Sequence, residues 1–521
     1  MQDVYPVLSC AEARDFEKTI LLDESAQWEA MVSAGHAVAR AVRRDFTWWK
    51  AWPASPRVLI LAGKGHNTGD ALLAVNEWAK TVDGLTALVV HLEEESERTP
   101  LMERSLELLV GTLGKSLETI VWSELENLPR SKVFDLTLDG MVGMNFQGPL
   151  REPMKTVLKW CDSHAGRLGF RVSIDLPSGM GDEPKVEAAF HADVTYATGV
   201  VKAPLLRDDS PEWAGRIRFL NLGFFEHQGV PQGSGDFIVS RRILERMGRL
   251  RPSFSDKRSF GQIFAIGGSR RTPGAILMAA HAAIRSGSGL VTAMVPAYLS
   301  NRMAGAVPEV MWHPLPATPD AGFMLDAAKQ VHHAVGDRGV LLMGPGMHVD
   351  RNSLFVVARL VREITLPIVL DAGALSGDVI GATLSRPKNA GPVILTPHMG
   401  EYNRMLGQSD GGYDRATFVE FAKKYQVIVI LKGPVTRITD GEQVLHLPNG
   451  SPVLARGGSG DILAGLVASR LAANPEDGLL AAVEAVMWHS RSADLLARVR
   501  GEIAVKSTEL LEYLAPALRG A

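Results

Sequence analysis

The sequence predicts an α/β protein made of two successive domains, and three observations support this. Short runs rich in β-branched residues alternate with helical stretches along the chain, which is typical of βαβ units and mostly parallel sheets. A chain of 521 residues is longer than a single domain with one hydrophobic core usually is. A stretch rich in Gly, Gln and Pro, Glu226–Phe237, separates two such series and is the best linker candidate. We therefore predict domains at residues 1–228 and 229–521.

In the first domain, we expect strands in six runs. They are 57–63, 86–92, 131–140, 171–179, 192–199 and 217–225. In the second domain, we expect another six. They are 261–269, 289–296, 339–346, 366–375, 391–398 and 427–433. A helical stretch at 274–287 lies between two of these runs, and Asp440-Gly441 between two β-rich segments predicts a hairpin over 436–447.

Composition excludes several classes of protein. Hydrophobic residues make up 46% of the chain and charged residues 22%, as in ordinary globular enzymes. The net charge of -3 gives no electrostatic reason to expect nucleic acid or an anionic membrane as a partner. Cys10 and Cys161 lie far apart, without metal-ligand spacing or a disulfide framework. Because the first residues lack a signal-like apolar segment and no apolar run could span a bilayer, we expect a cytoplasmic enzyme with small-molecule substrates. We also expect a homo-oligomer.

Acidic residues follow three strands of the first domain directly. They are Asp70 in "GKGHNTGDA", Asp139 in "TLDGMVG" and Asp175 in "VSIDLPSG". Ligands of open parallel sheets bind at the carboxyl ends of strands, so these side chains should gather there. Together with Asn67 and Ser178 they offer oxygen ligands that suit a hard cation. The alternatives are that each Asp caps a helix and that the glycine-rich loop is only a tight turn.

These motifs, in this order, resemble the YjeF N-terminal family, the NAD(P)HX epimerases, over residues 10 to 225. The resemblance rests on "LAGKGHNTGDA", "LDGMVGMNFQGPLREP", "SIDLPSG" and "HADVTYATGVVKAPL". It implies a Rossmann-like domain, a K+ site at Asn67, Asp139 and Ser178, and acid–base chemistry by Asp139 at C6 of the nicotinamide ring, with Lys202 a second candidate. The residues implied to bind hydrated NAD(P)H are His66, Asn67, Thr68, Gly69, Asp70, Gly143, Met144, Asn145, Phe146, Gln147, Gly148, Pro149 and Asp175.

The chain departs from that family at three loop positions. His66, Thr68 and Ala71 replace an Asn and two Gly residues. The Thr68 side chain is expected to stand where the nucleotide would approach the backbone. A domain that binds nucleotide without catalysis is therefore the alternative for this half.

In the second domain, "LARGGSGDILAG" places glycines and Asp461 at the start of an apolar helix. Backbone N–H groups of Gly457–Gly460 and the helix dipole would hold the charge of a transferring phosphate. Asp461 would then take the proton of an acceptor hydroxyl, although it could also merely cap the helix. "LLMGPGM", "LTPHMGE" with His398 and Glu401, and "ILKGPVT" with Lys432 each follow a predicted strand.

This pattern resembles the ribokinase-like superfamily and, more narrowly, the ADP-dependent NAD(P)HX dehydratases of the YjeF C-terminal family, over residues 240 to 515. The resemblance implies that Ala275, Gly346, His398 and Asp461 face the hydrated nucleotide, with Asp461 as base. The residues implied to bind ADP are Lys432, Gly433, Pro434, Val435, Thr436 and Gly460. Three positions depart from the family, since Gly373 stands at an Asp position, Arg456 at a Thr position and Ser451 at an Asn position.

Together the two resemblances imply an enzyme that repairs hydrated nicotinamide nucleotides. It would interconvert R- and S-NADHX or NADPHX and dehydrate the S form to NADH or NADPH, with ADP as co-substrate and K+ and Mg2+ as cofactors. The alternative is a ribokinase-like kinase of a small vitamin precursor with a non-catalytic N-terminal module.

Overall fold

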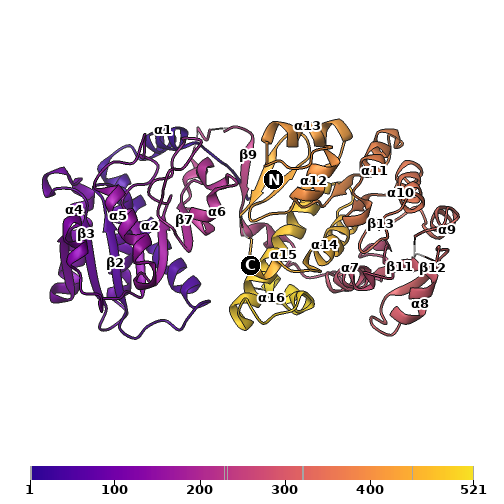
Figure 1. Ribbon diagram of the computed structural model, residues 1–521, viewed down its shortest axis with the longest axis horizontal. Helices are drawn as coiled ribbons and strands as arrows, with labels where there is room; N and C mark the ends of the chain where they lie inside the picture. Colours follow the sequence, from indigo (N-terminus) through magenta and orange to yellow (C-terminus); the bar gives the residue numbers. More distant parts are fainter. Residues whose placement is uncertain (1–2, 228, 232, 320–321, 449, 520–521) are drawn as a thin grey trace. The chain divides into compact units, whose positions relative to one another are not determined.

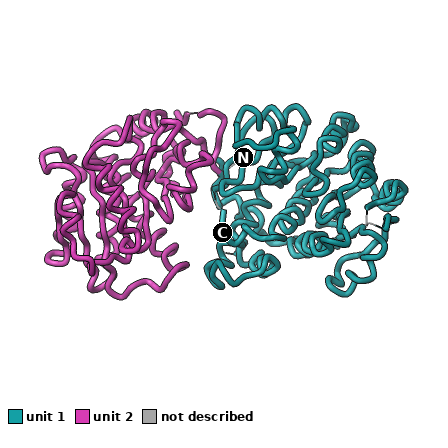
Figure 2. Tube along the Cα trace, viewed as in Figure 1, with its two compact units in different colours: residues 1–4, 239–521 teal, residues 5–238 magenta. Residues whose placement is uncertain are grey.

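The computed structural model describes residues 3–227, 229–231, 233–319, 322–448 and 450–519. The chain forms two compact units, shown in magenta and teal in Figure 2. The N-terminal unit is Tyr5–Ile238, and the C-terminal unit comprises Met1–Val4 and Val239–Ala521. The predicted boundary falls at residue 228, which lies outside the described residues.

The N-terminal unit contains a seven-stranded parallel sheet in the order β4-β3-β2-β5-β6-β7-β8. Its strands are β2 (Arg57–Ala62), β3 (Thr86–His91), β4 (Leu117–Val121), β5 (Leu136–Gly140), β6 (Phe170–Ile174), β7 (Val194–Thr198) and β8 (Arg216–Leu220). The chain order reverses between β2 and β5, which is the Rossmann-like switch point where ligands bind. β4 was not predicted, because its five residues are half exposed and polar residues interrupt them.

Helices cover both faces of this sheet (Figure 1). Val58 and Ile60 of β2 pack with α2 (Glu24–Phe46), α3 (His66–Ala79) and α4 (Pro100–Leu113), whereas Leu59 and Leu61 pack with α5 (Met154–Ser163). This alternation follows from the two-residue period of a strand, and it makes a strand buried on both faces read as continuously apolar. The remaining helices are α1 (Cys10–Ile20) and α6 (Ser210–Ala214).

The larger sheet has eleven strands in the order β1-β9-β18-β17-β16-β15-β14-β13-β10-β11-β12. Its strands are β1 (Val4–Pro6), β9 (Asp236–Val239), β10 (Gln262–Ile266), β11 (Leu290–Pro296), β12 (Met311–Leu315), β13 (Val340–Met343), β14 (Ile368–Leu370), β15 (Val393–Leu395), β16 (Ile428–Leu431), β17 (Thr436–Thr439) and β18 (Val444–Leu447). Strands β10 to β16 pair with one another in parallel, whereas β17 pairs antiparallel with β16. β17 and β18 form the hairpin predicted at 436–447.

Part of the predicted linker is wrong, because Asp236 and Phe237 belong to β9. β1 and β12 were not predicted either. β12 is short and partly exposed, and it contains His313 and Pro314, so its composition gives little strand signal.

Two groups of helices flank the strands of the C-terminal unit. Phe264 and Ile266 of β10 share a core with α9 (Ala327–Ala334), α10 (Arg351–Glu363), α11 (Gly377–Gly381) and α13 (Arg415–Tyr425). The second group is α7 (Pro273–Arg285), α14 (Ser459–Ala473) and α15 (Gly478–Arg500), and α14 packs closely on α7 at Gly465. Further helices are α8 (Ala297–Met303), α12 (Met399–Met405) and α16 (Leu514–Arg519). Among the described residues, no helix is long and apolar enough to cross a membrane.

Candidate active sites

A cavity of about 250 Å³ opens at the carboxyl ends of the strands around the switch point of the N-terminal unit. α2 and the segment after β8 contribute mostly apolar side chains to the lining, whereas α1 contributes Glu17. The segments after β2, β5, β6 and β7 contribute most of the polar side chains. The lining residues are Glu17, Leu21, Gln27, Ala30, Met31, Ala34, Lys64, Gly65, His66, Asn67, Asp70, Met141, Val142, Gly143, Met144, Asn145, Asp175, Thr198, Lys202, Leu222 and Phe224.

The glycine-rich loop after β2 leads directly into α3, whose first residue is His66 and whose N-cap, Gly65, offers no side-chain hydrogen bond. The first N–H groups of α3 are therefore available to an anion. The expectation that the Thr68 side chain blocks the backbone is wrong. Thr68 is fully buried, and its hydroxyl donates to the carbonyl oxygens of Gly63 (3.0 Å) and Gly140 (2.8 Å). It ties two strand ends together and does not line the cavity.

A buried ion pair lies at the base of the cavity. The Lys202 ammonium group donates to the Asp175 carboxylate, and both side chains are almost fully buried. Burial lowers the pKa of Lys202, but the nearby carboxylates of Asp175 and Glu17 outweigh it and raise the pKa overall. Asp175 adopts a φ of 67°, a conformation uncommon outside glycine that functional sites often retain.

Asp70 lies in the same cavity and is buried. Burial raises the pKa of Asp70 well above its usual range, and repulsion from Asp175 and Glu17 adds to this effect. Burial and the neighbouring carboxylates therefore favour the protonated, neutral form of this side chain.

Asp139 lies deeper than the lining. Its carboxylate accepts hydrogen bonds from Ser178 Oγ (2.6 Å), Ser178 N (2.8 Å), Ser173 Oγ (3.0 Å) and Met141 N (3.3 Å). Ser178 Oγ also lies 3.0 Å from the Val142 carbonyl oxygen. Asn67 Nδ2 donates to the carbonyl oxygen of Ile174 at the end of β6 (3.0 Å), and a Cβ on Gly143 would lie 2.9 Å from Oδ1 of Asn67. Asn67 thus lies beside the segments that follow β5 and β6, on which Val142 and Ser178 stand. One carboxylate with hydroxyl, amide and carbonyl oxygens is a donor set that fits a hard monovalent cation.

The structure places the predicted nucleotide-binding residues in two groups. His66, Asn67, Asp70, Gly143, Met144, Asn145 and Asp175 line the cavity, whereas Thr68, Gly69, Phe146, Gln147, Gly148 and Pro149 do not.

The candidate site of the C-terminal unit also lies at strand ends. β13, β14, β15 and β16 are consecutive neighbours, and Gly344, Asp371, His398 and Lys432 follow them closely. His398 and Lys432 form a parallel bridge beyond the regular strands, and Lys432 N donates to the Pro397 carbonyl oxygen (2.8 Å). Parallel pairing therefore brings residues that are distant in sequence to one edge of the sheet.

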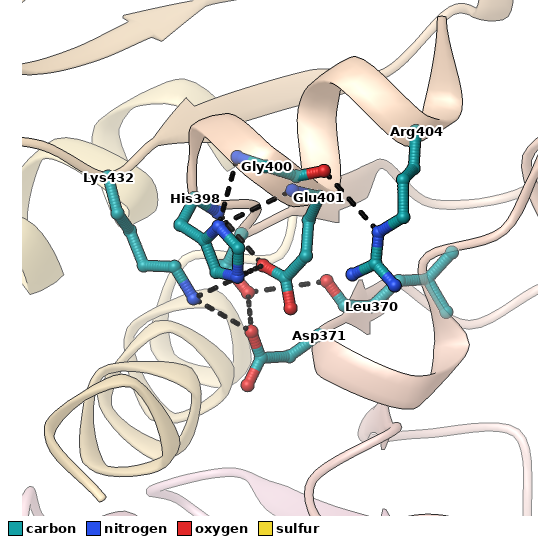
Figure 3. Close-up of polar contacts among 8 residues, drawn as sticks. Leu370, Asp371, His398, Gly400, Glu401, Arg404 and Lys432 are labelled. Carbon is teal, nitrogen blue, oxygen red and sulfur yellow. Dashed lines mark hydrogen bonds and ion pairs between the residues drawn. The ribbon is translucent and has the colours of Figure 1, made fainter. Parts of the chain in front are cut away.

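Lys432 lies among acidic side chains (Figure 3). Its Nζ is 3.2 Å from Oδ1 of Asp371 and 4.0 Å from Oε2 of Glu401. Glu401 also accepts from the His398 backbone N–H (2.9 Å), and His398 Nδ1 accepts from the N–H groups of Gly400 (3.1 Å) and Glu401 (3.3 Å). The His398 ring thus caps α12 through Nδ1 and leaves Nε2 to carry the proton, while more than half of its side chain is exposed.

The start of α14 approaches the same Lys432. Gly458, with φ 92°, is the N-cap and makes no side-chain cap bond, so the alternative in which Asp461 only caps the helix does not hold. A Cβ on Gly460 would lie 3.3 Å from Lys432 Nζ, which places the ammonium group beside the first turn of α14. Burial, followed by repulsion from Asp371, raises the pKa of Asp461 to about 6, and Lys432 limits the rise.

The other predicted residues of this unit lie in two places. Gly346 follows β13 with a φ of 64°, and a Cβ there would lie 2.8 Å from Cβ of Ala275 on α7, so these two predicted neighbours do meet. Gly433 and Pro434 form the exposed turn between β16 and β17, before Val435 and Thr436.

The substituted position Arg456 secures the glycine loop. Its guanidinium donates to the carbonyl oxygens of Glu502 (2.6 Å) and Ile503 (2.7 Å), so it joins the loop before α14 to the segment after α15. Ser507 Oγ donates to the Gly457 carbonyl oxygen (2.8 Å). Two contacts thus fix the loop on which Gly457–Gly460 lie.

Sequence reasoning gave no role to two charged residues of these sites. Asp371 ends a predicted strand, and this strand-end position could have revealed it. Glu17 lies on a helix remote in sequence from every motif, and no local pattern marks it.

Comparison with known proteins links both units to one family. Residues 28–203 match the model described as YjeF-related protein N-terminus, and residues 263–516 match the model described as NAD(P)H-hydrate dehydratase. A bifunctional NAD(P)H-hydrate repair enzyme Nnr from Gloeobacter violaceus is 30% identical over 506 residues, covering 94% of this chain and 93% of its own. The one from Moorella thermoacetica is 29% identical over 501 residues, covering 94% and 92%.

A solved structure is also similar. It is the ADP/ATP-dependent NAD(P)H-hydrate dehydratase from Bacillus subtilis co-crystallised with ATP/Mg2+, with 28% identity and a TM-score of 0.47 over 54% of this chain and 97% of that one. The family matches confirm the predicted order of a YjeF N-terminal domain followed by an NAD(P)H-hydrate dehydratase domain. The chain belongs to the family of bifunctional NAD(P)H-hydrate repair enzymes.

Proposed function

We propose that this enzyme returns hydrated NADH and NADPH to the cofactor pool through two reactions. The N-terminal unit interconverts the R and S epimers of NAD(P)HX. The C-terminal unit dehydrates the S epimer at the expense of ADP. The observation that supports this most is the pair of polar strand-end sites, one in each unit, within a chain related along nearly its whole length to such enzymes.

In the C-terminal unit, Asp461 acts as the base that takes the proton of the C6 hydroxyl as this oxygen attacks the terminal phosphoryl group of ADP. Its pKa of about 6 leaves it ionised at neutral pH yet basic enough to accept a proton. The N–H groups of Gly457–Gly460 and the Lys432 ammonium group balance the charge on the transferring phosphate. Phosphate then leaves C6 as the ring nitrogen supplies electrons, and loss of a proton from C5 restores the dihydronicotinamide.

The two faces of this site have different roles. Ala275, Gly346, His398 and Asp461 face the hydrated nucleotide. His398 offers Nε2–H, which lies 3.6 Å from Oε2 of Glu401, because its Nδ1 caps α12. The residues proposed for ADP are Lys432, Gly433, Pro434, Val435, Thr436 and Gly460. Mg2+ would accompany the phosphates of the nucleotide.

In the N-terminal unit, the hydrated nicotinamide end occupies the cavity, which at about 250 Å³ holds only part of a dinucleotide. K+ held by Asn67, Asp139 and Ser178 would fix the loop that includes Val142 and Gly143. The chemistry it supplies is positive charge beside the Asp139 carboxylate. We expect the enzyme to be cytoplasmic and homo-oligomeric, which cell fractionation and light scattering would test.

The test of function uses the full chain with an equilibrium mixture of NADHX epimers, ADP and Mg2+, and follows the absorbance of reduced nicotinamide. Complete recovery faster than spontaneous epimerisation is the expected result. Recovery of only the S share, with the remainder at the spontaneous rate, would overturn the epimerase and leave the dehydratase. No recovery with ADP or ATP would overturn the dehydratase and favour a kinase that keeps phosphate on its product.

A further inference from the structure

One carboxyl group in the N-terminal cavity belongs to no sequence motif and has no role in the reactions proposed above. Glu17, on α1, lines the cavity together with Asp70, Asp175 and Lys202. It comes from a helix far in sequence from every strand-end motif, and its side chain is only partly buried, so it is open to a bound ligand.

The position of α1 is fixed by attachments at its start and along its length. The N–H groups of Cys10 and Ala11 donate to the two carboxylate oxygens of Asp182, at 2.7 and 3.1 Å. Arg14 donates to the carbonyl oxygen of Met144, which itself lines the cavity (3.4 Å). One turn before Glu17, Ala13 is fully buried, so the helix face that carries Glu17 is the inward one.

Four titratable groups line the cavity together. Glu17 lies on α1, Asp70 on α3, Asp175 after β6 and Lys202 after β7, and Lys64 and His66 are the other titratable residues of the lining. Because Lys202 already pairs with Asp175, three carboxylates share one buried cation. Burial raises the pKa of Glu17 to about 7, Lys202 lowers it and Asp175 raises it. Near neutral pH, Glu17 therefore exists in both protonation states, as a group that gives and takes protons requires.

Asp139, the acid–base residue expected from the sequence, is less suited to this task. Four donors already occupy its carboxylate, and it does not line the cavity. We infer that the Glu17 carboxyl, with Asp70 as its partner, carries the protons of the N-terminal reaction. This assignment rests on the proposed epimerase function.

The step balances in atoms and charge. Protonated Asp70 gives its proton to the C6 hydroxyl, the C6–O bond breaks as the N1 lone pair forms the N1=C6 bond, and one water leaves. One water then adds to C6 from the other face of the ring and gives a proton to ionised Glu17. The reverse direction starts from protonated Glu17 and ionised Asp70. The reaction therefore needs one carboxyl protonated and the other ionised.

The experiment compares the wild-type chain with Glu17→Gln and with Asp15→Asn, a matched control on the exposed side of the same helix. Epimerisation of purified R-NADHX is followed by chromatography without ADP, across pH. The wild type should show a bell-shaped profile whose acidic limb lies near pH 7. Glu17→Gln should lower kcat by about 10²–10⁴-fold and lose the acidic limb. Its KM and its dehydratase activity towards S-NADHX should stay unchanged, and Asp15→Asn should behave as the wild type.

Each outcome decides the question. A wild type that epimerises while Glu17→Gln keeps the same rate and pH profile would overturn the assignment alone. A wild type that does not epimerise would overturn the proposed epimerase function, and the assignment would fall with it. If the N-terminal unit of Glu17→Gln loses its thermal transition, Glu17→Asp decides instead. A reduced rate with a displaced acidic limb supports the assignment, and an unchanged profile overturns it.

Discussion

Gly344, at the end of β13, should be indispensable for the C-terminal site, and Gly344→Ala tests this. Its φ of 118° is one that residues with a side chain rarely adopt. A Cβ there would overlap the carbonyl oxygen of Asp371 and lie 2.9 Å from Cβ of Ala374. The substitution must therefore move the segment that places the Asp371 carboxylate beside Lys432.

The expected loss of stability in Gly344→Ala is the sum of two contributions. Overpacking against a buried backbone costs about 1–3 kcal/mol, and the unfavourable φ adds about 1–2 kcal/mol. The free energy of unfolding of the C-terminal unit should fall by about 3 kcal/mol, which lowers its Tm by about 6–12 °C.

Differential scanning calorimetry measures this, because the transition of the N-terminal unit serves as an internal reference. Gly381→Ala, at the end of α11, is the matched control, since a Cβ there meets nothing within 4 Å. Dehydratase kcat should fall in Gly344→Ala and stay unchanged in Gly381→Ala. A Tm and a kcat equal to those of the wild type in Gly344→Ala would refute the reasoning.

Three further predictions concern single side chains. Asp461→Asn should lower dehydratase kcat by about 10²–10⁴-fold with epimerisation intact, and a loss of less than tenfold (about 1.4 kcal/mol) would argue against a base. Since Asp461 must be ionised to act as a base, dehydratase kcat/KM of the wild type should fall about tenfold per pH unit below about pH 6. Lys432→Met should move this acidic limb to higher pH, because Lys432 lowers the pKa of Asp461. An acidic limb at the same pH in Lys432→Met as in the wild type would show that Lys432 does not lower the pKa of Asp461. Thr68→Val should destabilise the N-terminal unit by about 2 kcal/mol, because two buried carbonyl oxygens lose their donor. Equal urea denaturation midpoints for this variant and the wild type would contradict that account.

The sequence by itself determined the order of the elements and the positions of most strands. Buried parallel strands such as β2 and β16 are short apolar runs, so the residue pattern alone predicts them as strands. Strand-end motifs also marked Asp70, Asp175, His398 and Lys432, because parallel topology brings strand ends to one edge whatever the details of packing. The glycine-rich start of a helix marked Asp461. The short or polar strands β1, β4 and β12 were not predicted from the sequence, because pairing with neighbouring strands, rather than their composition, makes these segments strands.

Only the tertiary structure decided how individual side chains point. From the sequence, the Thr68 side chain was expected to stand where the nucleotide approaches the glycine loop. In the structure its hydroxyl points inward and donates to two carbonyl oxygens at strand ends. Asp139 was expected as an acid–base residue at a strand end, yet hydrogen bonds enclose its carboxylate. Glu17 has no motif at all, and the docking of α1 alone brings it to the cavity. Local sequence fixes the backbone path and the chemical type of a residue, whereas its exposure, its partners and its pKa depend on segments that are distant along the chain.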